Sequence, residues 1–294
     1  MVEIPTIDLT NFPSEEAHLR EACQSLGCFR VIGHGIPDSL RAEMKAAVRA
    51  LFQLPIDIKR LNSDIIPGSG YVAPSPANPL YEAFGLYDAS SHLDVDAFCS
   101  RLHASAPHRD TVKTYAAKLH ALVVEIAGKI ANSIGVPSYP FEEWPCQFRM
   151  NKYSFTKETV GSSGVQIHTD SGFLTVLQED DSVGGLEIMD SSGTFVPVHP
   201  VPGSFLINLG DIAKVWSNGR LHNLKHRVQC KEEGERISIA LFLLGPKDSL
   251  VEPAKELVDS QHPRLYRSFT VENYRQLRLA SGSRDGESLS LLLL

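Results

Sequence analysis

The chain has 294 residues, 43% of them hydrophobic, and carries a formal net charge of −7 at pH 7. This length and composition suffice for one large domain or two small ones. The acidic balance and the lack of a basic tract argue against nucleic acid and anionic membrane surfaces as partners, and no apolar run approaches the roughly 18 residues that a membrane span needs.

The first part of the chain predicts two short strands and two helices. The strands are expected at residues 4–9 and 28–32. The first helix begins after Ser14, a residue type that caps helix N-termini, and it ends at Gly27. The second helix is expected at residues 38–54, between two prolines.

Residues 62–106 are the least regular region of the sequence. The glycines and prolines between positions 68 and 79 preclude long helices and strands. Aromatic side chains in irregular backbone either fix a loop to the core or line a binding site. The aromatic residues of this region are Tyr71, Tyr81, Phe84, Tyr87 and Phe98.

Residues 110–134 predict a long amphipathic helix, because apolar residues recur there at spacings of three and four. Gly135 ends the helix and Pro137 prevents its continuation. We expect this helix to pack across the outside of the β-structure and to carry no chemistry.

From residue 147 onward the pattern changes to short strands separated by turns that contain glycine and proline. Many short strands at such spacing are typical of a sandwich or barrel. We therefore predict a mainly β protein with flanking helices (α+β), whose core is a double-stranded β-helix, or jelly roll, of the cupin-like type. The expected strands are 147–153, 173–177, 186–189, 205–208 and 236–244.

These elements predict three parts. Residues 1–145 would form a helix and strand region that packs on the barrel. Residues 146–280 would form the jelly-roll core with a docking helix capped by Thr270. Residues 281–294, which begin with small and charged side chains, would form a flexible tail.

The cysteines show neither paired metal-ligand spacing nor a disulfide framework, which favours a reducing compartment. The N-terminal residues lack the basic and apolar regions of a signal peptide. We therefore expect a cytoplasmic protein, with a monomer as the default state. The cysteines are Cys23, Cys28, Cys99, Cys146 and Cys230.

The stretch from Val165 to Asp170 carries the strongest chemical signal. His168 and Asp170 are two residues apart, so on an extended strand both side chains point to the same face. With His226 as third ligand, two histidines and one carboxylate would form the facial triad that holds non-haem Fe(II) in oxygenases. His222 is a rival for the third position, but it lies in a polar turn whereas His226 lies on an expected strand.

Arg236 and Ser238 form a second pair on one strand face, opposite an apolar face. A guanidinium on an inward face needs an anionic partner, and arginine binds carboxylates through a bidentate fork. We expect Arg236 to bind a carboxylate and Ser238 to add its hydroxyl. Arg227 is the alternative, but it directly follows a ligand and would point away from the metal.

Several sequence blocks in fixed order resemble the plant 2-oxoglutarate/Fe(II)-dependent dioxygenases. The resemblance covers roughly residues 3–276 and implies the double-stranded β-helix fold, Fe(II), 2-oxoglutarate as co-substrate, O2, and ascorbate in a supporting role. The blocks are His168-Thr169-Asp170, residues 174–180, Gly210-Asp211, Ser217-Asn218-Gly219, His226-Arg227-Val228 and Arg236-x-Ser238, preceded by residues 4–9 and 27–36.

The resemblance also implies co-substrate residues. Tyr153 would bind the same distal carboxylate of 2-oxoglutarate as Arg236 and Ser238, and Asn151 would lie near the co-substrate. Relatives carry a proline shortly after this tyrosine, whereas Ser154-Phe155 follows here. This difference bears on the shape of the loop and leaves Tyr153 in place.

Within this family, the chain is most similar to the enzymes that oxidise auxin. The similarity implies a small-molecule substrate, indole-3-acetic acid, that is converted to 2-oxoindole-3-acetic acid with release of succinate and CO2. The strand face of Arg236 continues towards a pocket for a flat ring, although ordinary barrel core is an alternative for Phe242. The expected pocket residues are Phe242, Phe173, Tyr71, Tyr81 and Leu244.

Other functions stay open at the level of the sequence. The family also contains enzymes for gibberellins, flavonoids and other specialised metabolites, and an oxidase of the ethylene-forming type that uses ascorbate instead of 2-oxoglutarate. A catalytically inactive ligand-binding protein on the same fold is a further alternative. A zinc hydrolase would need a general-base carboxylate beside the metal, and Asp170 is consumed as a ligand.

Overall fold

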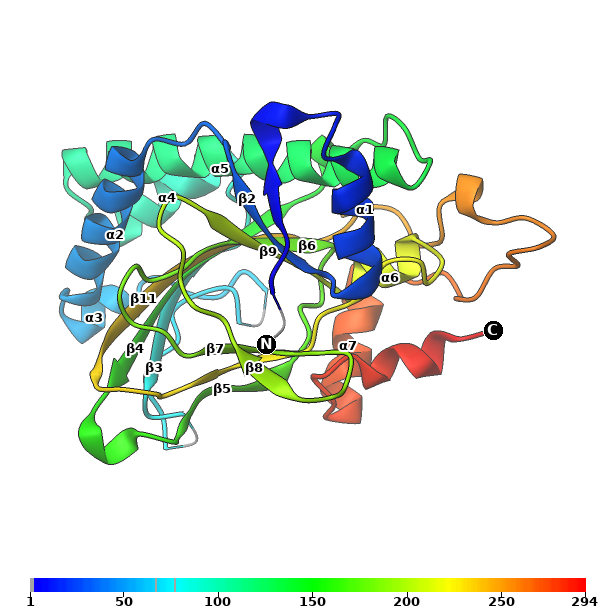
Figure 1. The fold of residues 1–294 in the computed structure, drawn as a ribbon. Helices are drawn as coiled ribbons and strands as arrows, with labels where there is room; N and C mark the ends of the chain where they lie inside the picture. The colour runs from blue at the N-terminus through cyan, green and yellow to red at the C-terminus, as the bar shows by residue number, and fades with distance from the viewer. Residues whose placement is uncertain (1–2, 67, 77) are drawn as a thin grey trace.

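The computed structural model describes residues 3–66, 68–76 and 78–294 (Figure 1). Its strands form a seven-stranded sheet in the order β1-β2-β9-β6-β11-β4-β3 and a four-stranded sheet in the order β5-β10-β7-β8. All neighbouring strands pair antiparallel except β1 and β2, which are parallel. The predicted mainly β fold with flanking helices, a double-stranded β-helix, is confirmed.

The described elements have the following bounds. The strands are β1 (Thr6–Asp8), β2 (Cys28–Ile32), β3 (Tyr81–Leu86), β4 (Cys146–Phe155), β5 (Ser163–His168), β6 (Leu174–Gln178), β7 (Leu186–Met189), β8 (Phe195–Pro197), β9 (Phe205–Leu209), β10 (His226–Gln229) and β11 (Gly234–Leu243). The α-helices are α1 (Glu16–Ser25), α2 (Asp38–Phe52), α3 (Ile56–Lys59), α4 (His92–Arg101), α5 (Ala106–Ser133), α6 (Asp211–Trp216) and α7 (Val271–Ser281).

Strand β11 has one face in the hydrophobic core and the other face towards a cavity. It pairs with β4 on one side and with β6 on the other. Ile237, Ile239 and Leu241 are buried in the core beneath the helices, whereas Arg236 and Ser238 line a cavity between the two sheets. Because side chains alternate along a strand, the sheet thus has an apolar outer face and a polar inner face.

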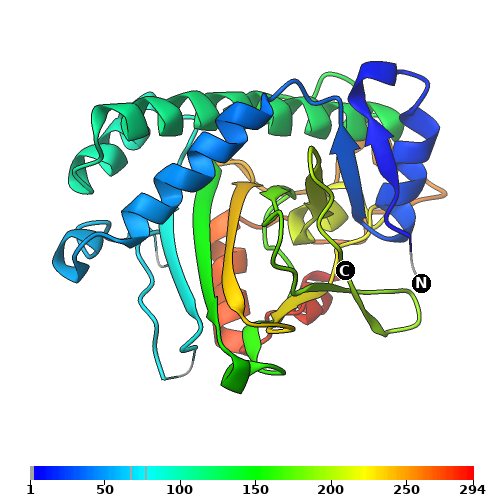
Figure 2. The same cartoon turned by 60° about the vertical axis from the view of Figure 1, so that its left-hand side comes forward.

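Helix α5 covers the outer face of this sheet (Figure 2). Ser105 caps it by accepting a hydrogen bond from the amide of His108. Its apolar stripe, which includes Leu119, Val123 and Ile126, is buried, and the helix lies against α2, β6 and β11. The helix begins four residues before the predicted range of 110–134 and ends one residue before the end of that range.

Two regular elements lie in the region predicted to be irregular. Strand β3 and helix α4 both follow the last proline of residues 62–106, and Ser91 caps α4 by accepting from the amide of Asp94. β3 forms one edge of the seven-stranded sheet, and β1 and β2 lie at the other edge. Residues 1–145, of which 3–66, 68–76 and 78–145 are described, therefore contribute strands to the larger sheet. The division at residue 145 stays a prediction.

The C-terminal segment corrects the expectation of a flexible tail. Residues 281–294 contain a 3₁₀ helix, η5 (Glu287–Leu292), whose Ser288 and Leu289 are buried. Leu289 belongs to the main hydrophobic core, and the carbonyl of Arg284 accepts a hydrogen bond from the amide of Thr169. The polar composition suggested disorder, but backbone hydrogen bonds and one buried leucine fix the segment.

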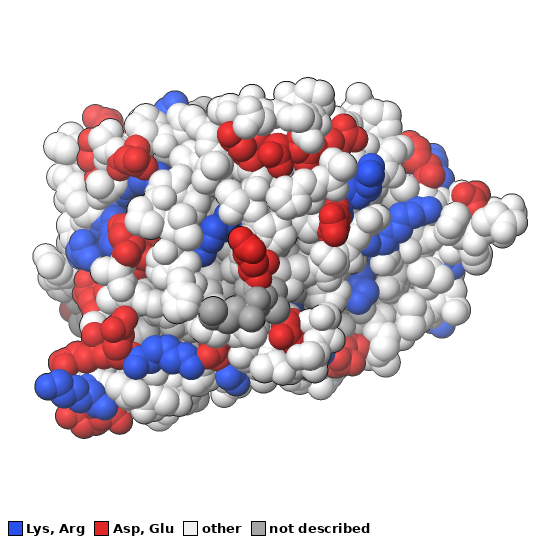
Figure 3. All heavy atoms as spheres, in the orientation of Figure 1, with Lys and Arg blue, Asp and Glu red and all other residues white. Residues whose placement is uncertain are grey.

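Acidic and basic side chains are interspersed over the face drawn in Figure 3. Within the described residues, no helix is both long and apolar enough to cross a bilayer. All five cysteines are buried and carry free thiols.

Candidate metal centre and active site

Three side chains of the predicted triad meet at one end of the smaller sheet. His168 ends β5, His226 begins β10, and the two residues are paired across these strands. The Nε2 atoms of both histidines lie 3.8 Å from Oδ1 of Asp170, and one ligand atom from each residue lies within 4.8 Å of the others. Two imidazoles and one carboxylate at this spacing fit the facial site of non-haem iron.

The surrounding hydrogen bonds leave the right atoms free for a metal. Nδ1 of His168 lies 2.9 Å from the carbonyl oxygen of Gln166, and Nδ1 of His226 lies 3.3 Å from that of Leu224. Since a carbonyl only accepts, each Nδ1 carries the proton and each Nε2 keeps its lone pair.

Charge and protonation also suit metal binding. Thr175 donates its hydroxyl proton to Oδ2 of Asp170, which leaves Oδ1 facing the histidines. Burial, followed by the neighbouring His226, lowers the pKa of His168 to about 4. The ring is therefore neutral near pH 7, the form that binds a metal.

A cavity of about 140 Å³ lies next to the triad between the two sheets. Arg236, Ser238, Tyr153 and Asn151, the predicted co-substrate residues, all line it. Arg236 donates to Oγ of Ser238 over 3.3 Å, and its buried Nε has no hydrogen-bond partner in the described chain. An orphaned buried guanidinium nitrogen beside a metal site fits a carboxylate-bearing co-substrate.

Tyr153, another predicted co-substrate residue, lies beside Arg236 in this cavity. Burial raises the pKa of the Tyr153 hydroxyl, so this group stays protonated. The guanidinium of Arg236 lies 5.1 Å from the centre of the Tyr153 ring. By contrast Arg227, the alternative clamp, pairs with Glu187 over 2.7 Å and does not line the cavity, as the alternation of the strand predicted.

An outer, open cavity of about 1220 Å³ adjoins the triad. Phe242 lines both cavities, Leu244 lines the outer one and Tyr81 lines the inner one. The positions of these three residues agree with the expected pocket.

Two expected pocket residues lie elsewhere. Phe173 is fully buried in the main core, with its ring centre 4.8 Å from that of Phe141. The chain turns at Gly172, where a Cβ would lie 2.5 Å from the carbonyl oxygen of Leu243, so closeness to Asp170 along the chain does not place Phe173 in the pocket. Tyr71 packs on Phe84 outside the cavities.

The structure adds cavity residues that the sequence interpretation missed. Arg149 lines both cavities and is only 8% exposed. It donates to the hydroxyl of Tyr81 over 3.2 Å and to the carbonyl of Gly68, and no carboxylate among the described residues pairs with it. The sequence carried a signal for this residue, because Arg149, Asn151 and Tyr153 alternate on one strand face.

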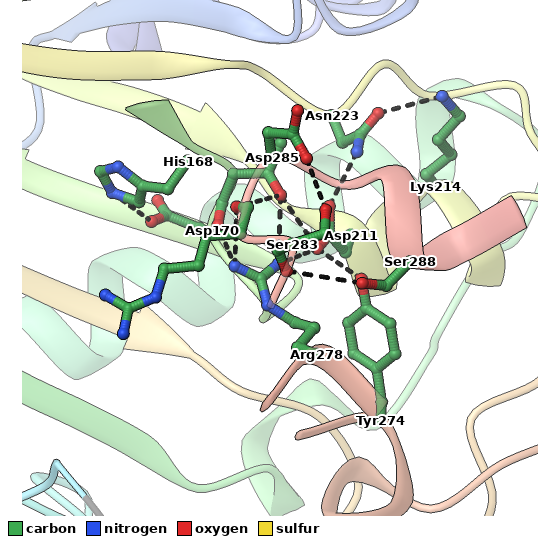
Figure 4. Close-up of polar contacts among 12 residues, drawn as sticks. His168, Asp170, Asp211, Lys214, Asn223, Tyr274, Arg278, Ser283, Asp285 and Ser288 are labelled. Atoms are coloured by element: carbon green, nitrogen blue, oxygen red, sulfur yellow. Dashed lines mark hydrogen bonds and ion pairs between the residues drawn. The ribbon is translucent and has the colours of Figure 1, made fainter. Parts of the chain in front are cut away.

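The sequence interpretation also missed cavity residues from α7 and the C-terminal segment. Arg278, Ser283, Arg284 and Asp285 line the outer cavity, and Figure 4 shows Arg278 and Asp285 close to His168 and Asp170. No sequence pattern connects this segment to a metal site so far away along the chain.

Two regions of the chain match models of known protein families. Residues 144–245 match the model of the 2OG-Fe(II) oxygenase superfamily, and residues 4–94 match the model described as non-haem dioxygenase in morphine synthesis N-terminal. The first region contains the triad and the residues from Asn151 to Phe242 that line the inner cavity.

Relatives match the chain from end to end. The 2-oxoglutarate-dependent dioxygenase DAO of rice (Oryza sativa) is 61% identical over 99% of both chains. The crystal structure of the dioxygenase for auxin oxidation from rice superposes with a TM-score of 0.93 at 60% identity, over 99% of this chain and 100% of that one. The complex of dioxygenase for auxin oxidation 1 from Arabidopsis thaliana with 2-oxoglutarate superposes with a TM-score of 0.86 at 55% identity, over 89% and 100%.

These matches agree with the geometry of the site. The matching family model is that of an oxygenase superfamily, and the full-length rice relative is a dioxygenase. These matches exclude the zinc hydrolase considered from the sequence. The chain therefore belongs to the 2OG-Fe(II) oxygenase superfamily and is a 2-oxoglutarate-dependent dioxygenase with an iron site at His168, Asp170 and His226.

Proposed function

We propose that this enzyme oxidises indole-3-acetic acid to 2-oxoindole-3-acetic acid. One O2 would be consumed, with one oxygen atom entering the indole ring and the other entering succinate as 2-oxoglutarate loses CO2. The 61% identity to the rice enzyme over 99% of both chains carries this proposal, because the solved rice structure is that of a dioxygenase for auxin oxidation.

The co-substrate would occupy the inner cavity. Arg236 would bind the distal carboxylate of 2-oxoglutarate, with Ser238 and Tyr153 donating their hydroxyls and Asn151 lying alongside. The support is that this guanidinium is buried and pairs with no carboxylate among the described residues, since such a charge is costly unless a ligand compensates it. When bound, Fe(II) and 2-oxoglutarate supply the activated oxygen for the reaction.

The substrate would occupy the outer cavity, with its carboxylate at Arg149. Gln147 on β4 and Thr175 on β6 both pair with Phe242 of β11, and Thr175 holds Asp170. Arg149 is two residues along β4 from Gln147, about 7 Å along the strand, and β4 and β6 are two strand spacings apart, about 10 Å across the sheet. Arg149, His168 and Asp170 line the same two cavities, so an indole acid held at Arg149 can reach the metal with its ring.

The aromatic part of the substrate would lie against Phe242. This side chain lines both cavities and offers a flat apolar face for an indole ring. Tyr81 would close the inner side, where its hydroxyl donates to Oδ1 of Asn151 over 2.8 Å. Leu244 would extend the apolar wall outward.

Location and assembly are proposed on simpler grounds. Five buried free thiols suit a reducing compartment, so we place the enzyme in the cytoplasm. We propose that it works as a monomer, since both cavities and the triad are formed by one chain.

A substrate panel tests the proposed function. Anaerobic enzyme with Fe(II) and 2-oxoglutarate would be exposed to O2 and to indole-3-acetic acid, gibberellins or a flavanone, and the products read by mass. We expect the auxin to be consumed and the other compounds to remain. Consumption of a gibberellin or flavanone with the auxin left intact would overturn the substrate assignment.

A further inference from the structure

The carboxylate of Asp211, at the start of α6, is fully buried and receives four side-chain donors. The hydroxyls of Thr169 and Tyr274 donate to Oδ2 over 3.0 and 2.6 Å, and the amide of Asn223 donates to Oδ1 over 2.7 Å. The guanidinium of Arg278 completes the set through a close ion pair with Oδ2. Figure 4 shows this cluster beside His168 and Asp170.

The cluster converges on Thr169, the residue between two metal ligands. The Thr169 hydroxyl is held by Asp211, its carbonyl accepts from Nη2 of Arg278 over 2.9 Å, and its amide donates to the carbonyl of Arg284 over 2.8 Å. The same Nη2 donates to the carbonyl of Arg284 over 2.9 Å. Every polar group of this buried residue is therefore fixed, and two of its three partners, Arg278 and Arg284, come from residues 271–292.

Asp211 also holds the next residue directly. Its backbone amide donates to the carbonyl of Asp170 over 2.8 Å. The peptide groups on both sides of Thr169 are thus held in place, and these peptide groups set the directions in which the His168 and Asp170 side chains leave the backbone.

We propose that Asp211 and Arg278 are positioning residues for the metal centre. They clamp Thr169 so that His168 and Asp170 stay at ligand spacing, and docking of residues 271–292 thereby becomes part of iron binding. The inference rests on the iron site of the family and is independent of the identity of the organic substrate.

The size of the effect follows from the environment of the clamp. Groups that orient metal ligands typically change metal affinity by about 10- to 100-fold when removed. Breaking the pair of Arg278 with the buried Asp211 leaves that carboxylate without its cation, and the Thr169 backbone loses a donor at the same time. Arg278→Gln and Thr169→Val should both weaken Fe(II) binding within this range.

The test is an anaerobic titration of the apo protein with Fe(II) alone, together with calorimetric melting. Arg275→Gln is the matched control, because Arg275 lies three residues before Arg278 on α7 and pairs with the exposed Glu272 over 2.6 Å. We expect at least tenfold weaker Fe(II) binding for Arg278→Gln and Thr169→Val, and a change below twofold for Arg275→Gln.

Unchanged Fe(II) affinity in folded Arg278→Gln and Thr169→Val would overturn the proposal, even if their melting temperatures fall. If Arg278→Gln fails to fold, Thr169→Val decides the question, since valine keeps the size and backbone contacts of threonine and removes only the hydroxyl bonded to Asp211. Co(II) titration, followed by visible absorption, gives a second readout of ligand geometry. Because no organic substrate is present, failure of the auxin assignment cannot produce the same result.

Discussion

Two buried arginines at this cavity, Arg236 and Arg149, have no carboxylate partner among the described residues, unlike the other buried arginines. Arg30 is also buried, but it pairs with Glu179 through a short contact and donates to Ser204 over 3.2 Å. Arg236 and Arg149 are 2% and 8% exposed, and neither pairs with a carboxylate of the described chain. Two buried cations facing one cavity predict two anionic ligands, which matches a dicarboxylic co-substrate and an acidic substrate.

Removal of Arg236 should act on the co-substrate. Leaving one partner of a buried charge pair alone costs about 3–5 kcal/mol, so Arg236→Ala should raise the KM for 2-oxoglutarate at least a hundredfold. Arg236→Lys should also be impaired, because an ammonium cannot reproduce the guanidinium fork. Arg227→Gln, outside the cavity, serves as the control. Steady-state kinetics with varied 2-oxoglutarate would refute the assignment if Arg236→Ala kept its KM.

Removal of Arg149 should act on the substrate instead. Hydrogen bonds to charged groups contribute about 1.5–3 kcal/mol, so Arg149→Gln should lower kcat/KM for indole-3-acetic acid by about 10- to 150-fold. Neutral indole-3-acetamide should be affected much less, since it offers no carboxylate. Equal losses for the acid and the amide would show that Arg149 does not recognise charge.

At the level of elements, β11 carries the site because strand alternation keeps its two faces separate over ten residues. Phe242 shares the inner face with Arg236 and Ser238. Phe242→Ala should therefore weaken auxin turnover while iron and 2-oxoglutarate binding change little. Phe173→Leu is the control, because Phe173 lies in the main hydrophobic core outside the cavities. This variant should lower the melting temperature and leave auxin turnover unchanged. If Phe242→Ala keeps its kcat/KM for auxin and merely melts earlier, Phe242 is core and not pocket wall.

The same alternation explains what the sequence could predict. Within one strand the period of two is local, so the shared faces of Arg236 and Ser238, and of Asn151 and Tyr153, were correct expectations. The prediction for Phe173 was wrong because it rested on closeness to Asp170 along the chain, whereas after the turn at Gly172 the Phe173 side chain lies in the core. A turn of this kind depends on the approach of β11.

At the scale of the whole molecule, contacts between residues far apart in the sequence are what the sequence alone does not predict. Nothing in the polar composition of residues 281–294 indicates that the Arg284 carbonyl meets the amide of Thr169. The choice between irregular loop and regular structure for β3 likewise depends on β4, which offers a strand edge for pairing. The order of the motifs predicted the metal ligands, whereas the contribution of Arg278 and Arg284 to the cavity wall became visible only in the folded chain.

The proposed oxidation of indole-3-acetic acid at the expense of 2-oxoglutarate is tested most directly by comparing the amounts of the two products, succinate and oxidised auxin. Enzyme with Fe(II), 2-oxoglutarate, O2 and indole-3-acetic acid would be followed for succinate and for the oxidised auxin by mass and by NMR. We predict equal amounts of succinate and 2-oxoindole-3-acetic acid, with no conversion by His226→Ala. Succinate formation that neither requires nor consumes the auxin would contradict the account.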